Sequence, residues 1–393
     1  MRLGLVLSND WELYGDGSGD YFGLQRRPLR EMLDLAAEFG AKLTLMAEVG
    51  QQWAHQQQAA QEDWAAEIAA AWEADVVEAA RCGADVQLHL HSQWLDAQWR
   101  GAWHLDLNRW CVSALPAAEQ VRAFRRGKQY LESLVSAGSP RYACAIFRAG
   151  AYCLEPSAVV VASLQQAGLD CDTSVTKGLT NPGFFDFRDA ESSLFPWWIG
   201  ERGVKYAGRP GGLIELPIFA AALGDSPLLR KLTGFTYTRW VPARERRWQA
   251  KRRDWLSRCY SSAKRPHPPS AGIAARNSSR LSGALFRTAT VPLDYDGLPA
   301  SVFVDLLDRL GRDDAVCRQV AHLEQQSGTE ITLPVMASGH TKVMMDCENF
   351  RWILRMARER LGDRMMFLTA TEALSVARTI LAPSAQVPSR RAG

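Results

Sequence analysis

The feature that most constrains the fold of this chain is a repeated alternation of short apolar segments with amphipathic helical segments. The first apolar run, 3–8, is followed by a helical pattern over 28–39 whose apolar residues share one face. Further strands are predicted at 42–47, 86–91, 143–147, 169–173, 212–218 and 332–336. Further helices are predicted at 51–80 (one or two), 118–137, 157–167, 300–310, 313–326 and 347–361. This alternation indicates an α/β fold with a parallel sheet or a β/α barrel.

Composition narrows the class of protein. Of the 393 residues, 47% are hydrophobic and 23% are charged, as in globular proteins, and no apolar run approaches the roughly 20 residues of a membrane span. The first apolar run starts beside the initiator methionine and leaves no room for a signal peptide, so we expect a cytoplasmic protein. The eight cysteines contain no C-x-x-C spacing, which favours reduced thiols. A net charge of +3 gives no reason to expect nucleic-acid binding.

A basic segment at about 228–287 interrupts the alternation. It is rich in arginine and lysine and ends in a Pro-Ser-Gly-rich run over 266–283, which leaves too few apolar residues for a buried strand. We expect an insertion in a single catalytic domain covering 1–380, followed by a disordered tail over 381–393. Such a segment is a candidate for peripheral contact with a membrane or a lipid-linked substrate.

Ionisable residues lie at the ends of several predicted strands. His89 and His91 are two residues apart, as are Asp10 and Glu12, and residues at this spacing point to the same face of a strand. Two imidazoles and one carboxylate form a common zinc-ligand set. The pattern predicts one divalent metal ion, most simply zinc, held by the two histidines and one of the two acids. The alternative is that the histidines only form structural hydrogen bonds.

Other strand ends add groups that could act with this metal. Arg148 follows the fourth predicted strand and can hold a carboxylate, while Asp172 and His340 follow two later strands. In a β/α barrel the carboxyl ends of the strands form one mouth, where active sites are built. Aromatic residues near these ends are candidates for stacking on sugar rings, namely Trp11, Trp94, Trp99 and Tyr152. The glycine-rich stretch 15–20 is expected to be a lid.

The order of these motifs resembles the polysaccharide deacetylase family (carbohydrate esterase family 4), which includes the chitooligosaccharide deacetylase of nodulation. The resemblance covers most of residues 1–345 and lies in motif order. It implies a distorted seven-stranded β/α barrel. It also implies that Asp10 and Glu12 divide the roles of base and metal ligand, with Asp10 assigned as the base, and that His89 and His91 complete the metal site.

The same resemblance implies roles for the later motifs. Arg148 matches the arginine that orients the base, and His340 matches the general acid. Asp172 matches the aspartate that precedes small hydroxyl residues in the family, and we expect it near the substrate together with Trp11, Trp94 and Tyr152. The implied activity is metal-dependent hydrolysis of the acetamido group of a sugar, a C–N bond. A cytoplasmic location favours a nucleotide-linked or lipid-linked intermediate of surface polysaccharide biosynthesis as the substrate.

Two other functions are compatible with parts of the sequence. A metal-free glycoside hydrolase on a related barrel would use Asp10 or Glu12 together with Asp172 as its pair of carboxylates. A catalytically inactive barrel would instead bind an anionic partner through the basic segment around 244–265. The pair His89 and His91 favours the metal-dependent hydrolase over both.

Overall fold

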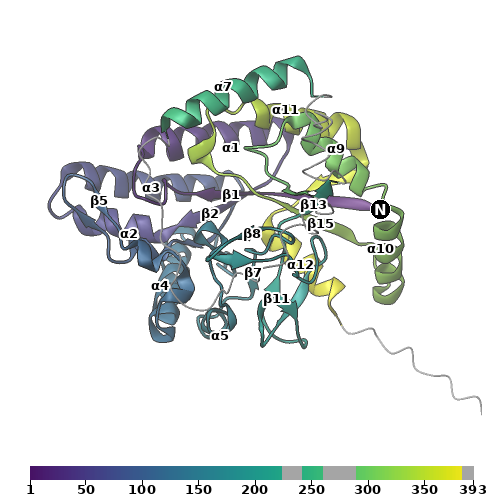
Figure 1. Ribbon diagram of the computed structural model, residues 1–393, viewed down its shortest axis with the longest axis horizontal. Helices are drawn as coiled ribbons and strands as arrows, with labels where there is room; N and C mark the ends of the chain where they lie inside the picture. The colour runs from purple at the N-terminus through teal and green to yellow at the C-terminus, as the bar shows by residue number, and fades with distance from the viewer. Residues whose placement is uncertain (224–240, 260–288, 383–393) are drawn as a thin grey trace, which may run out of the picture.

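A computed structural model describes residues 1–223, 241–259 and 289–382 of the chain. Its main element is a sheet of ten strands (Figure 1). These strands are β1 (Arg2–Trp11), β2 (Leu43–Glu48), β3 (Asp85–Leu90), β6 (Ile146–Ala149), β7 (Cys171–Asp172), β10 (Trp197–Gly200), β11 (Gly203–Ala207), β12 (Ile214–Glu215), β15 (Thr332–Ala337) and β16 (Met365–Phe367). The expected α/β class is therefore confirmed.

The sheet is mixed, with a parallel centre. Its order is β11-β10-β12-β7-β6-β3-β2-β1-β15, and β16 also pairs with β1. The strands from β12 to β15 are parallel to their neighbours, whereas β10 and β11 are antiparallel additions at one edge. The sheet is curled, because Ile218, just beyond β12, forms a parallel bridge with Met336 on β15. All the carboxyl ends of the central strands therefore meet on one side.

The helices cover the sheet, which explains why its strands are apolar. They are α1 (Arg27–Phe39), α2 (Val49–Gln58), α3 (Asp63–Arg81), α4 (Ala117–Val135), α5 (Ala158–Gln166), α7 (Ala243–Cys259), α9 (Ala300–Leu310), α10 (Asp314–Ser327), α11 (Glu348–Leu361) and α12 (Ala370–Ile380). Figure 1 shows α1, α9 and α11 on one side of β1, and α4 and α5 on the other. With both faces covered, β1 is buried from Leu3 onward, as its continuous apolar run requires.

Some element boundaries differ from the sequence predictions. The segment 51–80 forms two helices, α2 and α3, and the strands predicted at 169–173 and 212–218 shorten to the two-residue strands β7 and β12. The antiparallel strands β10 and β11, the strand β16 and the helix α12 have no counterpart in the predictions. Short hairpins also occur, β4 (Gln98–Trp99) with β5 (Trp103–His104) and β8 (Thr180–Asn181) with β9 (Phe185–Asp186).

The basic segment contributes one described helix, α7, between the antiparallel strands β13 (Ala220–Leu223) and β14 (Ala289–Pro292). The two buried side chains of the helix, Glu245 and Trp248, anchor it to the domain. Trp248 Nε1 donates to Asp346 Oδ1 at 2.7 Å, and Glu245 accepts from the amide and hydroxyl of Ser301 at 3.0 and 2.6 Å. The expected loop over 266–283 and the tail beyond 382 lie outside the described residues.

Within the described ranges 1–223, 241–259 and 289–382, no helix combines the length and apolar character needed to cross a bilayer. The predicted single domain and the seven-stranded form of the barrel stay predictions.

Candidate metal centre

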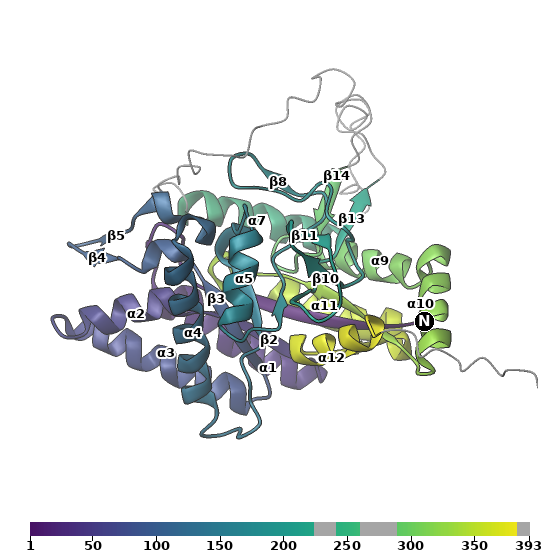
Figure 2. The same ribbon diagram turned by 90° about the horizontal axis from the view of Figure 1, so that it is seen from below.

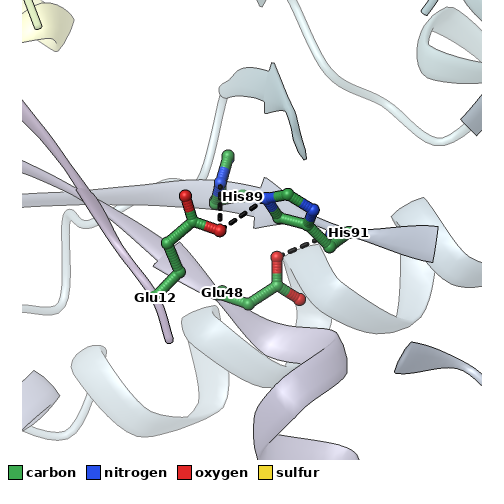
Figure 3. A group of neighbouring side chains, drawn as sticks. All are labelled: Glu12, Glu48, His89 and His91. Carbon is green, nitrogen blue, oxygen red and sulfur yellow. Dashed lines mark hydrogen bonds and ion pairs between the residues drawn. The ribbon is translucent and has the colours of Figure 1, made fainter. Parts of the chain in front are cut away.

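Four ionisable side chains converge at the carboxyl ends of three neighbouring parallel strands (Figure 3). Glu12 follows β1, Glu48 ends β2, His89 lies in β3 and His91 follows it. All four are buried, and each offers a donor atom within 4.8 Å of the others. The strand register explains the convergence, because Glu48 pairs directly with His89. The described part of the chain therefore contains a buried acidic and histidine cluster able to hold a metal ion.

Glu12 lies at the centre of this cluster. Its Oε2 is 2.5 Å from His91 Nε2 and 3.6 Å from His89 Nε2. Its other oxygen, Oε1, accepts from Lys342 Nζ at 2.6 Å. Burial alone would raise the pKa of Glu12, but His91 and Lys342 outweigh burial and hold the pKa well below its usual range. Glu12 is therefore an ionised carboxylate aimed at two imidazoles.

The two imidazoles present their Nε2 atoms to Glu12. His89 Nδ1 lies 2.9 Å from the carbonyl oxygen of Arg148, which only accepts, so Nδ1 carries a proton, and Nε2 is the nitrogen left to bind a metal when the ring is neutral. His91 Nδ1 lies 3.0 Å from Gln93 Nε2. Neither Nε2 atom makes a hydrogen bond of good geometry, although both are buried. Two such nitrogens facing one carboxylate oxygen fit a divalent metal with two histidine ligands and one glutamate ligand.

Glu48 belongs to the cluster but has other partners. Its Oε1 accepts from the amides of Gly50 and Gln51, which caps α2, and its Oε2 accepts from the amide of His91 at 2.6 Å. Both oxygens are therefore engaged by backbone N–H groups, and Glu48 fixes the backbone that carries His91. The sequence analysis did not include Glu48. Its position between a predicted strand and a predicted helix was the signal that could have identified it.

Gly150 provides the space for His91. A Cβ atom at this position would lie 2.4 Å from Cγ of the His91 ring, closer than any side chain tolerates. Gly150 follows Arg148 in the motif that links β6 to the next turn, so this motif serves the metal cluster as well as the arginine.

Asp10 is held by Arg148 rather than by the two histidines. Arg148 Nη1 donates to Asp10 Oδ1 at 2.6 Å, and the same guanidinium donates to Ser8 Oγ at 2.8 Å and the Thr173 carbonyl at 2.9 Å. Burial raises the pKa of Asp10, but Arg148, His89 and His340 together outweigh burial and the net pKa is lowered. Asp10 is thus an oriented, ionised carboxylate beside the cluster.

His340 reaches the same place from the end of β15. It bridges to Asp10 in the sheet, and its Nε2 lies 3.5 Å from Asp10 Oδ2. Asp296 accepts from the His340 amide at 2.7 Å and lies 3.1 Å from Nδ1. Burial lowers the pKa of His340, but the hydrogen bond to Asp296 and the charge of Asp10 raise it to about 9. His340 is therefore a protonated imidazole at neutral pH.

Two residues that the sequence analysis missed support His340. The first is Asp296, described above. The second is Arg252 of α7, which donates to Asp296 Oδ1 at 2.9 Å and to the Val343 carbonyl at 3.2 Å. The basic segment thus contacts Asp296, the residue that holds His340. Asp296 and Arg252 lie in regions of weak periodicity, and no spacing pattern connects them with His340.

Three of the predicted substrate contacts require correction. Trp11 is fully buried against Tyr21 and Trp72, at ring-centroid distances of 6.0 and 5.4 Å, and its Nε1 donates to the Gln25 carbonyl. Trp94 is 2% exposed and packs against Trp103. Neither ring has a face available to a sugar.

Asp172 is the third correction. It is fully buried, accepts from the amide and hydroxyl of Ser174 at 3.0 and 2.9 Å, and lies in register with Glu215. Burial raises the pKa of both Asp172 and Glu215, and their mutual proximity raises that of Glu215 further. Asp172 is therefore part of a structural carboxyl pair, and it is not available as the second carboxylate of a glycosidase.

Tyr152 remains compatible with contact to a substrate, because it is half-buried. It and Ala151 adopt left-handed backbone conformations, with φ of 59° and 51°, which cost energy for residues other than glycine. Burial and the charge of Asp10 raise the pKa of Tyr152, so its hydroxyl keeps its proton and lies in the electrostatic reach of the site.

No family model matches the chain, and no curated protein matches it. Solved structures similar to it include a 4-alpha-glucanotransferase from Thermococcus litoralis, with TM-score 0.42 and 11% identity over 95% of this chain. A protein assigned as a polysaccharide deacetylase from Mycobacterium smegmatis also has TM-score 0.42 and 11% identity, over 98% of this chain and 93% of its own length. A family 4 carbohydrate esterase from Streptomyces lividans, solved with acetate, has TM-score 0.25 and 14% identity over 44% of this chain.

This chain spans 38% of the length of the glucanotransferase and 61% of that of the esterase. Likenesses at these TM-scores and identities do not establish a family for the chain. The function proposed below therefore rests on the residues of the site.

Proposed function

We propose that this protein is a metal-dependent N-deacetylase that hydrolyses the acetamido group of a sugar. The observation that carries the proposal is the arrangement of Glu12, His89 and His91, whose donor atoms face one another beside the separately held acid Asp10. A glycosidase needs two carboxylates across a bond. It does not need two buried imidazole nitrogens that face one carboxylate.

Glu12, His89 and His91 would hold the metal, and zinc suits this ligand set. When bound, the metal supplies Lewis acidity that polarises the amide carbonyl and acidifies water. Asp10 would take the proton of the attacking water, because Arg148 keeps its carboxylate ionised and oriented. His340 would then donate its proton to the leaving nitrogen, giving a free amine and acetate. An acid and a base held by different partners suit amide hydrolysis.

The barrel form and the domain organisation belong to the same proposal. We propose that β1, β2, β3, β6, β7, β12 and β15 form a seven-stranded barrel whose seam is the parallel bridge between Ile218 and Met336. We also keep 1–380 as one catalytic domain with an insertion at about 228–287, which the antiparallel pairing of β13 with β14 supports. The cytoplasmic location and a nucleotide-linked or lipid-linked substrate remain predictions.

The test is acetate release with metal content measured in parallel. Purified protein is loaded with zinc and incubated with an N-acetylglucosamine oligosaccharide, and the same assay is run on His91→Ala. We expect one bound zinc ion and acetate release by the natural protein, and loss of both in the variant. Zinc-independent acetate release, or hydrolysis of the glycosidic bond with no acetate, would overturn the proposal.

A further inference from the structure

A partly open cavity lies beside the glycine-rich loop that follows β1. Its volume is about 510 Å³, within the range of small-molecule sites. Its walls come from the loop Leu13–Tyr21, from α2 and α3, and from the β4–β5 hairpin, which Figures 1 and 2 place next to these helices. None of Glu12, Glu48, His89 or His91 lines it. The cavity is therefore distinct from the metal cluster.

Aromatic rings form much of the cavity wall. Trp64 and Trp99 are half-buried, with centroids 4.6 Å apart and ring planes at 54°, and Trp103 lies 5.4 Å from Trp99. Half-buried tryptophans present flat apolar surface next to solvent. Such surface matches the C–H face of a pyranose ring.

His55 adds an unused polar group to the wall. Its side chain is 1% exposed, and its Nδ1 makes no hydrogen bond of good geometry in the described structure, although the backbone of Gln51 is within reach of the ring. Its ring packs edge-on against Trp64 and Trp103, at 6.0 and 5.3 Å. Burial lowers the pKa of His55 to about 4, so the ring is neutral. A buried imidazole nitrogen whose hydrogen bond is poorly aligned costs free energy, which a hydrogen bond to a ligand would recover.

The glycine-rich loop supplies carboxylates to the cavity. Asp20 is fixed because it accepts from the amides of Phe22 and Gly23, and Asp16 accepts from the amide and hydroxyl of Ser18. At Gly17, φ is +83° and a Cβ atom would lie 2.6 Å from Cβ of Trp103, so the loop is closely packed on the hairpin. The loop predicted as a lid is thus a wall of this cavity in the structure. Fixed carboxylates are suited to accept from sugar hydroxyls.

The loop also connects the cavity to the metal cluster. Glu12 is followed directly by Leu13, the first residue that lines the cavity. Gln93 Nε2 lies 3.0 Å from His91 Nδ1 and donates to the Gly15 carbonyl at 3.1 Å. A ligand held in the cavity is therefore next to the segment that carries Glu12.

We propose that this cavity binds a further sugar ring of the glycan whose acetamido group is hydrolysed at Glu12, His89 and His91. The substrate is then a chain of at least two sugars rather than a single one. This inference rests on the proposed deacetylase function. Aromatic faces, fixed carboxylates and a neutral imidazole together suit a neutral ring that has apolar faces and hydroxyl edges.

The experiment titrates metal-free protein with chitotriose, a trimer of N-acetylglucosamine, by isothermal calorimetry. Replacing either half-buried ring, Trp64→Ala or Trp99→Ala, should raise the Kd for chitotriose about tenfold, the effect expected for loss of one stacking contact. The matched control is Trp198→Ala, a half-buried tryptophan on β10 that does not line the cavity. It should bind chitotriose as the natural protein does, and all three variants should keep the zinc content of the natural protein.

The outcomes separate this inference from the proposed function. Failure to release acetate, together with chitotriose binding that depends on Trp99, would overturn the deacetylase and leave a sugar-binding cavity. Acetate release with chitotriose binding unchanged in both Trp64→Ala and Trp99→Ala would overturn the cavity and leave the deacetylase. Displacement of chitotriose by tetramethylammonium would assign the aromatic rings to a cation and would also overturn the sugar site.

Discussion

Arg148 on β6 donates a 2.6 Å hydrogen bond to Asp10 on β1, although β3 and β2 separate these two strands in the sheet. Both side chains are buried. A contact between strands that are three positions apart requires the sheet to curl so that the two side chains meet across its interior. The same ion pair therefore holds the curvature of the sheet and the proposed base.

The first prediction concerns the free energy of unfolding. Replacing Arg148 by Met removes the main counter-charge of the buried Asp10 carboxylate and leaves it the more distant His340, at 3.5 Å, which should cost about 3–5 kcal/mol. Asp10→Asn in the same background should recover part of that loss, because the uncompensated charge is removed. Urea unfolding of the two variants measures both effects.

The control for this prediction is Arg188→Met, since Arg188 forms an exposed ion pair with Asp186. Its loss should lie within about 1 kcal/mol. Equal losses for the Arg148 and Arg188 variants would mean that the buried pair has no special role in stability.

The second prediction separates the two glutamates of the cluster. Glu48→Gln keeps an oxygen that can accept from backbone amides, so zinc affinity should fall by about 10-fold to 100-fold through the position of His91. Glu12→Gln removes the charged ligand itself, and its loss should be larger. Zinc titration of both variants against a competing chelator gives the order. A greater loss for Glu48→Gln would identify Glu48 as the ligand in place of Glu12.

The metal-site and base residues predicted from the sequence are those whose direction follows from the two-residue period of a strand. Asp10 with Glu12 and His89 with His91 share a face because they are two apart, and parallel strands bring their carboxyl ends together. The same alternation explains the error at Trp11: it lies between two acids that face the site and therefore points to the opposite, covered face.

Other site residues depend on contacts that no local pattern specifies. Lys342 reaches Glu12 over 330 positions, and Asp296 reaches His340 from a segment without clear periodicity. Asp172 was predicted near the substrate, but the sequence does not show that Glu215 lies in register beside it. Pairings of this kind depend on how far the sheet curls, which only the folded chain determines.

The third prediction tests the general acid. His340→Ala should lower kcat by about two to four orders of magnitude while the protein keeps its zinc, because the leaving nitrogen loses its proton donor. His322→Ala, which replaces an exposed histidine on α10, is the control and should leave kcat unchanged. Steady-state acetate release with metal analysis distinguishes the two. Undiminished kcat in His340→Ala would remove it from the mechanism.

The fourth prediction concerns the alkaline limit of activity. An acid must be protonated to act, so activity should fall as the pH rises through the pKa of His340, about 9. Asp296 raises this pKa, and Asp296→Asn should therefore move the alkaline limb to lower pH. The pH profile of kcat measures the shift. An alkaline limb that stays in place in Asp296→Asn would assign it to another group.

The last prediction concerns the dependence of stability on pH, through the buried carboxyls of Asp172 and Glu215. Burial raises the pKa of both residues, so the folded protein retains protons that the unfolded chain releases above about pH 4. The folded state then binds more protons than the unfolded state, and the stability that this pair contributes is lost as the pH rises. The slope is at most about 1.4 kcal/mol per pH unit for each retained proton.

Glu215→Gln should remove this dependence, because an amide can donate to Asp172 without titrating. Compared with the natural protein, the variant should lose stability at pH 5 and lose less, or gain, at pH 9. Urea unfolding at several pH values measures the difference. Glu372→Gln is the control, since Glu372 is partly exposed and Lys42 contributes to lowering its pKa. A constant difference between Glu215→Gln and the natural protein from pH 5 to pH 9 would show that the two carboxyls do not share a retained proton.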